Sequence, residues 1–167
     1  MIADSSSLIL LAKISVLDRL LSHLKEPVTI TPAISNECTA KEGTMDAQLI
    51  QRIFKEGRIL KRTLRESRLS RNLEKDFNLG SGEAEAIQLC LEQKQGLITD
   101  DKRAIQTCRI LKIPFTTALN LVLQLHNRRK LDRQEAETYV NKLKSFGRYS
   151  TELINKAKEE LHHDSNE

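Results

Sequence analysis

The chain has 167 residues, of which 39% are apolar and 30% charged, a balance typical of a globular protein of about one domain. Its net charge of +4 is compatible with a nucleic-acid partner, whereas an aromatic content of 4% without tryptophan argues against base stacking on aromatic platforms. No run reaches the about 18 apolar residues of a membrane span, and three widely spaced cysteines argue against a disulfide framework or a cysteine zinc site and favour a reducing cytoplasm.

Short apolar runs alternate with helical patterns along the chain. In chain order, we expect a strand at 1–3, helices after Asp4 and from Ser15, a strand at 27–31, helices from Pro32 and at 45–56, an edge strand at 58–63, helices at 65–76 and after Gly80-Ser81-Gly82, a strand at 96–99, a helix at 101–111, a strand at 113–116, and helices at 117–128, 133–145 and 150–163. This alternation predicts an α/β fold with a parallel sheet covered on both faces. We expect one domain over 1–163, with a core at about 1–128, C-terminal helices at about 133–163 and a tail at 164–167.

Four acidic residues stand close to expected passages from strand to helix: Asp4, Glu37, Glu83 and Asp101. Ligands of open α/β sheets bind beyond the carboxyl ends of the strands, and we expect Asp4, Glu83 and Asp101 at that edge. Clustered carboxylates repel one another unless a cation joins them, and hard oxygen ligands select magnesium or manganese over zinc. The spacing does not choose between Glu83 and Glu85, or between Asp101 and Asp100.

Each of these acids also has a purely structural interpretation. Asp4 and Asp101 suit helix N-caps, whose side chains accept backbone hydrogen bonds. Glu83 lies in the first turn of a helix, where the helix dipole favours an acid, and Glu37 suits a solvated helix face. The joint placement of the four acids, rather than any one of them, therefore supports the hypothesis of a metal site.

Four segments resemble the motifs of PIN-domain ribonucleases, in the same order along the chain: I-A-D-S-S-S-L-I at 2–9, T-P-A-I-S-N-E at 31–37, G-S-G-E-A-E-A-I at 80–87 and L-I-T-D-D-K-R-A at 97–104. The resemblance spans about residues 2–125, and the third motif is most similar to a subgroup without assigned function that is related to VapC-type toxins. It implies a three-layer α/β/α sandwich with a central parallel sheet, to which this chain adds extra C-terminal helices.

The same resemblance implies an endoribonuclease of toxin type that uses Mg²⁺ or Mn²⁺ to hydrolyse RNA phosphodiester bonds. Its catalytic acids would be Asp4, Glu37, Glu83 and Asp101, and its metal ligands would be Asp4, Glu83 and Asp101. Supporting or alternate residues would be Ser6, Thr99, Glu85 and Asp100. The expected partners are RNA, an antitoxin-like inhibitor protein and a second copy of the chain in a homodimer, without a membrane.

Two basic stretches, at 52–71 and 128–133, offer contacts for RNA phosphates without reading its sequence. The candidates are Arg62, Arg65, Arg128 and Arg129, although a solvated helix face is the commoner explanation of such runs. These stretches and the apolar faces of the last two helices also suit a second hypothesis. In it, the chain keeps the fold but serves as a non-catalytic RNA-binding or oligomeric partner protein.

Overall fold

The structure, a computed structural model, describes residues 1–41, 43–65, 67–147 and 149–163; the expected tail at 164–167 lies outside them. The sheet found in these residues is parallel, with five strands in the order β3-β2-β1-β4-β5. Its strands are β1 (Ile2–Ala3), β2 (Val28–Ile30), β3 (Ile59–Lys61), β4 (Leu97–Ile98) and β5 (Phe115–Thr116). All five expected strands are therefore confirmed, and β3 lies at the expected edge.

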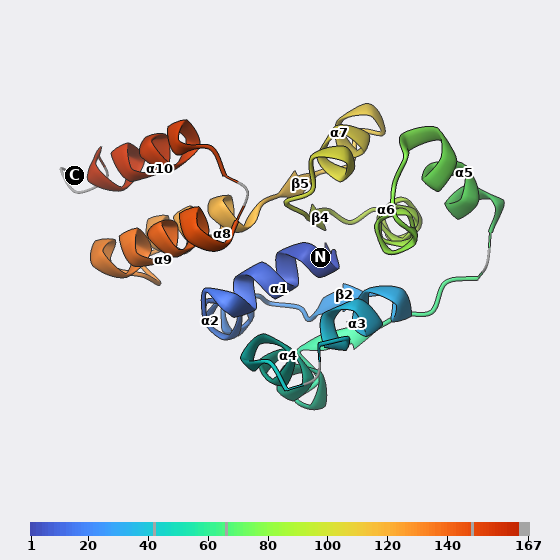
Figure 1. Cartoon of the computed structure of the whole chain (residues 1–167), viewed down its shortest axis with the longest axis horizontal. Helices are drawn as coiled ribbons and strands as arrows, with labels where there is room; N and C mark the ends of the chain where they lie inside the picture. Colours follow the sequence, from blue (N-terminus) through green and yellow to red (C-terminus); the bar gives the residue numbers. More distant parts are fainter. Residues whose placement is uncertain (42, 66, 148, 164–167) are drawn as a thin grey trace.

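Helices connect the strands and cover both faces of the sheet (Figure 1). They are α1 (Ser5–Lys13), α2 (Leu17–Ser22), α3 (Pro32–Thr39), α4 (Met45–Lys55), α5 (Arg68–Phe77), α6 (Ser81–Gln93), α7 (Lys102–Ile110), α8 (Ala118–Asn127), α9 (Arg133–Phe146) and α10 (Thr151–His163). Right-handed crossovers place α1–α4 on one face and α5–α7 on the other. The contacts of α8 and α9 with α1 add the C-terminal helices to the first layer, which confirms the α/β/α sandwich. None of the helices, as far as the structure describes them, is long and apolar enough to cross a membrane.

Capping residues explain why the helices begin directly after the strands. Asp4, Thr31, Asp101 and Thr117 follow the ends of β1, β2, β4 and β5, and each side chain accepts a hydrogen bond from a backbone N–H of the next helix. Pro32 occupies the first turn of α3, as expected. The crossovers that leave β1, β2 and β4, and the helix that follows β5, therefore start with a polar side chain at the carboxyl edge of the sheet, which is the edge where the acids were expected.

Two helix starts differ from the sequence prediction. The second helix begins at Leu17 rather than at Ser15, because Ser15 has a left-handed backbone with φ of 65°. The fifth begins at Arg68 rather than Arg65, because Ser67 is extended and caps α5 by accepting the N–H of Ser70. In both cases the hydrophobic periodicity correctly predicted a helix, and the backbone conformation of one residue set where the helix begins.

The apolar faces of α9 and α10 are buried within the single chain. Their buried residues are Ala136, Val140, Leu143, Ile154, Ala157 and Leu161. From the sequence, the C-terminal helices were expected to have apolar surface to spare for a second subunit. Most of this apolar surface is instead covered within one chain, because α9 packs on α8 and α10 packs on both. Among the residues expected on these faces, Leu153 keeps half of its surface exposed.

This packing predicts that the C-terminal helices share one cooperative core with the sheet. Leu143→Ala is expected to lower the free energy of unfolding by about 2–5 kcal/mol, because Leu143 is fully buried. Leu153→Ala is the matched control, because Leu153 is 51% exposed on the neighbouring helix. It should change the free energy of unfolding by about 0.5 kcal/mol or less in the same urea titration. A separate early transition in either titration would contradict a single core.

Candidate active site

The sheet has one position where successive connections leave in opposite directions. The chain passes from β1 to β2 on one side and from β4 to β5 on the other, so β1 and β4 flank a crevice at their carboxyl ends. Asp4 directly follows β1, and Thr99, Asp100 and Asp101 follow β4. The Asp4 N–H donates to the carbonyl of Ile98 at 3.1 Å, which holds the two segments side by side.

Asp4 is a buried carboxylate with one oxygen left without a hydrogen bond. Its side chain is 2% exposed, and Oδ1 accepts hydrogen bonds from the Ser7 N–H at 2.8 Å and the Ser6 hydroxyl at 3.1 Å. Oδ2 is buried and accepts no hydrogen bond from the described residues. Burial raises the pKa of Asp4 to about 6, although Thr99, Ser7 and Ser6 act to lower it. A buried oxygen of this kind normally has a partner, and a cation would supply one.

Glu37 and Glu83 approach each other where α3 meets α6. A Cβ atom at Gly82 would lie 2.9 Å from Oε1 of Glu37, so the end of the Glu37 side chain lies directly against the first turn of α6. Oε2 of Glu83 accepts the Gly80 N–H at 2.9 Å in a capping arrangement. Burial raises the pKa of Glu83, the Gly80 N–H lowers it, and the charges of Asp101 and Glu37 raise it further. Three of the expected acids therefore act on one another electrostatically.

Asp101 is a helix cap and also a member of this acidic group. Its Oδ1 accepts the N–H groups of Arg103 at 2.8 Å and Ala104 at 3.0 Å, while its own N–H donates to the Thr99 hydroxyl at 3.2 Å. Within the described residues, no hydrogen bond reaches its Oδ2. The capping interpretation is therefore confirmed for both Asp4 and Asp101. It does not compete with metal binding, because in each residue a single oxygen serves as the cap.

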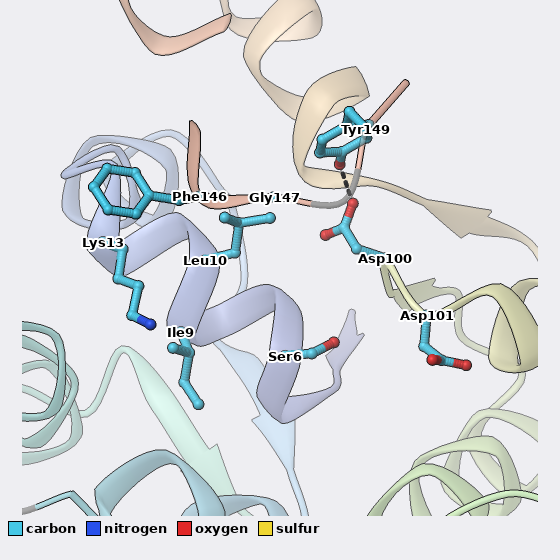
Figure 2. A pocket seen from close by; sticks show the side chains of 9 residues that line it. All are labelled: Ser6, Ile9, Leu10, Lys13, Asp100, Asp101, Phe146, Gly147 and Tyr149. Carbon is cyan, nitrogen blue, oxygen red and sulfur yellow. Dashed lines mark hydrogen bonds between the residues drawn. The ribbon is translucent and has the colours of Figure 1, made fainter. Parts of the chain in front are cut away.

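The neighbouring Asp100 has a different role (Figure 2). Its oxygens accept hydrogen bonds from the Ser7 hydroxyl at 2.8 Å, from the Ala118 N–H at 3.2 and 3.3 Å, and from the Tyr149 hydroxyl. Tyr149 in turn accepts the Leu119 N–H at 3.2 Å, and burial together with the Asp100 charge raises the pKa of Tyr149. Asp100 thus joins α1, α8 and the segment before α10, so Asp101 is the better candidate ligand.

Glu85 leaves α6 on a different side from Glu83. It lies two residues beyond Glu83 on α6, which corresponds to about 200° around a helix, so the two side chains leave on different sides. The charges of Asp101 and Glu37 raise the pKa of Glu83, which places Glu83 within the acidic group. The structure therefore favours Glu83 where the spacing left the choice open.

Three consecutive serines each serve a different acid. The hydroxyl of Ser5 donates to Glu37, that of Ser6 to Asp4, and that of Ser7 to Asp100. Successive residues of a helix project about 100° apart, so one turn at the start of α1 can reach three directions. Sequence analysis selected only Ser6 and missed Ser5 and Ser7, although the run of hydroxyls directly after Asp4 was a usable signal. Tyr149 had no local signal, because its partners come from distant segments.

The basic candidates divide between two ends of the molecule. Arg62 and Arg65 are exposed and follow β3 at the carboxyl edge, on the side of the acids. Arg128 and Arg129 lie at the far end of α8, which starts at that edge and runs away from it for about 15 Å. The structure therefore separates Arg128 and Arg129 from the acidic group.

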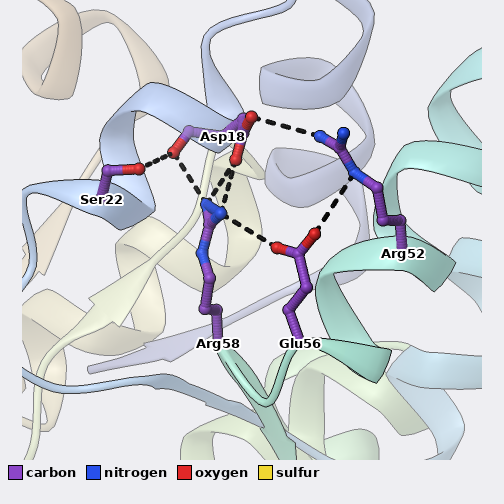
Figure 3. A network of polar contacts seen from close by, with 5 residues as sticks. All are labelled: Asp18, Ser22, Arg52, Glu56 and Arg58. Atoms are coloured by element: carbon purple, nitrogen blue, oxygen red, sulfur yellow. Dashed lines mark hydrogen bonds and ion pairs between the residues drawn. The ribbon is translucent and has the colours of Figure 1, made fainter.

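Other arginines of the first basic stretch are held in ion pairs (Figure 3). Arg58 contacts Asp18 at 2.5 Å and Glu56 at 3.1 Å, and Arg52 contacts Asp18 at 3.2 Å. This network ties α2 to α4 and to the segment that enters β3. Arg52 and Arg58 are therefore engaged within the protein, whereas Arg62 and Arg65 remain candidates for phosphate contacts.

The chemistry of the donor set fits a hard divalent cation. No ion pair within the described residues neutralises Asp4, Glu37, Glu83, Asp100 or Asp101. In the part of the chain that the structure describes, no three or more His, Cys, Asp or Glu side chains lie closely enough together to hold a metal ion. Because Mg²⁺ commonly keeps several waters and uses one or two carboxylates, this open arrangement suits a largely hydrated ion.

Comparison with known proteins places these features in one family. A family model described as "DUF3368: PIN domain" matches residues 1–163, from the first residue to the end of α10. No curated protein and no solved structure matches the chain. The family match therefore covers the sheet, all the acids discussed above and the C-terminal helices.

Proposed function

Because this chain belongs to the PIN-domain family, whose members are generally nucleases, we propose that it is a metal-dependent endoribonuclease that hydrolyses RNA phosphodiester bonds. The observation that carries the proposal is the buried Oδ2 of Asp4, which lacks a hydrogen bond at the switch point of the sheet. An uncompensated carboxylate in that position is costly unless a cation completes it. Negative charge that no ion pair offsets supports the same conclusion.

In this proposal, Asp4, Glu83 and Asp101, together with Glu37, hold Mg²⁺ or Mn²⁺ largely through the waters of the ion, because no three of these side chains are placed closely enough to bind it directly. When bound, such an ion stabilises negative charge on a phosphodiester and lowers the pKa of a water. The serines orient the acids, because Ser6 fixes Asp4 and Ser5 fixes Glu37. Thr99 supports both Asp4 and Asp101 from its buried position after β4. Arg62 and Arg65 contact the RNA backbone at the neighbouring strand end.

The proposal predicts cleavage of single-stranded RNA that requires Mg²⁺ or Mn²⁺ and stops with a chelator. Asp101→Asn should reduce the rate by about 100-fold or more, because the amide keeps the helix cap but loses the charge. Asp132→Asn is the matched control, because Asp132 caps α9 in the same way, with its Oδ1 accepting the Glu135 N–H at 2.8 Å. Asp132→Asn should cleave at the wild-type rate. Equal, metal-dependent cleavage by both variants would refute the role of Asp101.

Finer properties follow from the resemblance of the motifs to toxin-type nucleases. We propose that the protein acts in the cytoplasm as a toxin-type nuclease, that an antitoxin-like protein inhibits it, and that it forms a homodimer. The three free cysteines, all buried, are consistent with a reducing compartment. Light scattering at micromolar concentration tests the dimer, and a purely monomeric protein would refute it.

One observation favours the alternative of a non-catalytic RNA-binding or oligomeric partner protein. The described acids do not form a closed cage for a metal ion. Titration with Mn²⁺, followed by calorimetry, separates the two functions. Binding that Asp4→Asn removes supports the nuclease, whereas the absence of binding at the acidic edge supports the non-catalytic protein.

A further inference from the structure

A cavity of about 370 Å³ extends from the acidic edge along α1 (Figure 2). We call it the α1 cavity, and its walls include Ser6, Ile9, Leu10, Lys13, Phe146 and Tyr149. Asp100 and Asp101 line the end nearest the acids. The volume lies within the range of about 300–1,000 Å³ that is usual for small-ligand sites. We propose that the α1 cavity binds one unpaired nucleotide of a single-stranded RNA substrate, with Phe146 stacking on the base and Lys13 contacting a phosphate.

The aromatic residues make the first argument. The chain has only four phenylalanines, two tyrosines and no tryptophan. This composition argued against aromatic platforms in general, yet Phe146 and Tyr149 both line this single cavity. Phe146 is 59% exposed, so the core does not account for its position. An exposed aromatic ring beside a polar cleft offers a face on which any base can stack.

The polarity of the cavity makes the second argument. Ser6, Ile9 and Lys13 lie on one face of α1, and two helical turns, about 11 Å, separate the serine from the lysine. Lys13 forms no ion pair in the part of the chain that the structure describes. The cavity therefore has an acidic end beside Asp101, an apolar floor at Ile9 and Leu10, and a cationic end. A nucleotide has matching parts, because its phosphates are anionic and its base is flat and largely apolar.

Continuity of the surface makes the third argument. A second hollow of about 550 Å³ between α1 and α4 shares Lys13 and Phe146 with the α1 cavity. A strand whose base lies in the cavity can therefore continue past Lys13 over α4. A base inside a duplex cannot enter such a cavity without leaving its stack, so the substrate class is single-stranded RNA. This inference rests on the proposed function for the choice of RNA over other polyanions.

Binding is measured with the wild-type protein and a short fluorescein-labelled oligouridylate in the presence of a chelator, so that no cleavage occurs. Phe146→Ala should weaken binding by about 5-fold or more, the usual effect of losing one stacked base. Lys13→Gln should weaken binding, and it should reduce the slope of log affinity against log salt concentration by about one. Leu153→Ala and Lys25→Gln are the matched controls, because both residues are exposed and lie outside the cavity. A duplex of the same length should bind more weakly than the single strand.

A second readout uses the absence of tryptophan from the chain. Phe146→Trp introduces one fluorophore at the cavity, and Leu153→Trp introduces one outside it. Oligouridylate should quench the fluorescence of the first variant and leave the second unchanged. Equal affinity in Phe146→Ala and wild type, or no quenching in Phe146→Trp, would overturn the inference. A dimer that Phe146→Ala dissociates, together with unchanged RNA affinity, would assign the cavity to a protein contact and would also overturn it.

The outcomes separate this inference from the proposed function. If the wild type cleaves no RNA with either metal but binds it through Phe146, the proposed function fails and the inference stands. If Asp101→Asn loses cleavage while Phe146→Ala keeps the RNA affinity and the cleavage rate of the wild type, the inference fails and the proposed function stands. Loss of cleavage in Asp101→Asn with Phe146-dependent binding intact supports both.

Discussion

Asp4→Asn is expected to abolish RNA cleavage and at the same time to stabilise the protein at neutral pH. The loss of activity should be about 100-fold or more, because Asp4 supplies the buried, open oxygen of the site. Stability should rise because burial lifts the pKa of Asp4 from 3.8 to about 6, which corresponds to about 3 kcal/mol against the charged form. Asparagine caps a helix as well as aspartate does, so α1 remains intact. The gain should be below 3 kcal/mol, because the amide buries its own N–H group.

The pH dependence of this gain gives an independent check. The pKa of Asp4 is higher in the folded than in the unfolded protein, so the native state holds its proton over the range between the two values. The wild type should therefore lose stability relative to Asp4→Asn as pH rises from about 4 to about 6, and the difference should stay constant above about 6. Urea titrations across this range measure it.

Mn²⁺ gives a test of the same residue that does not depend on catalysis. A ligand that binds the native state raises its stability, so Mn²⁺ should raise the melting temperature of the wild type but not of Asp4→Asn. Asp132→Asn should respond to Mn²⁺ as the wild type does. A destabilised, active Asp4→Asn protein would contradict the assignment of Asp4 to the site.

Asp100→Ala is expected to lower the free energy of unfolding by about 2–4 kcal/mol. Its carboxylate accepts hydrogen bonds from Ser7, Ala118 and Tyr149, and hydrogen bonds to a charged group contribute about 1.5–3 kcal/mol each without being additive. Tyr149→Phe removes one of these donors and should cost about 1–2 kcal/mol. Urea unfolding measures both variants.

Activity distinguishes this structural role from metal binding. Asp100→Asn keeps the size of the side chain and a carbonyl acceptor, so it should remain folded and cleave RNA at close to the wild-type rate. Asp101→Asn, one residue away, should be inactive. The reverse pattern, with Asp100→Asn inactive and Asp101→Asn active, would exchange the roles of the two neighbours.

Sequence periodicity was sufficient for the architecture because four of the five described strands are short apolar runs with a capping residue close behind them. Asp4, Thr31, Asp101 and Thr117 carry this signal locally, and the crossover rule then orders the layers. Helix boundaries were less predictable where one residue adopts an unusual backbone, as Ser15 does. Periodicity averages over several residues and cannot detect a single left-handed residue.

The acids of the candidate site could be selected from the sequence, but the contacts that distinguish one acid from another could not. Aspartates at 100 and 101 look equivalent in sequence, and only the contacts of Asp100 with α8 and Tyr149 distinguish them. Those contacts join residues 18 and 49 positions apart, so no local pattern reports them. Gly82 is a similar case, because its close approach to Glu37 depends on how α3 and α6 pack.

The order of the strands has a consequence for how the protein is made. β1 is synthesised before the other strands of this sheet, yet one of its two neighbours, β4, is synthesised about ninety residues later. Until β4 arrives, Asp4 has no Thr99 or Asp101 beside it. A nascent chain therefore carries Asp4, Glu37 and Glu83 before Thr99 and Asp101 have been made, so under the proposed function it gains hydrolytic activity only after β4 has been synthesised.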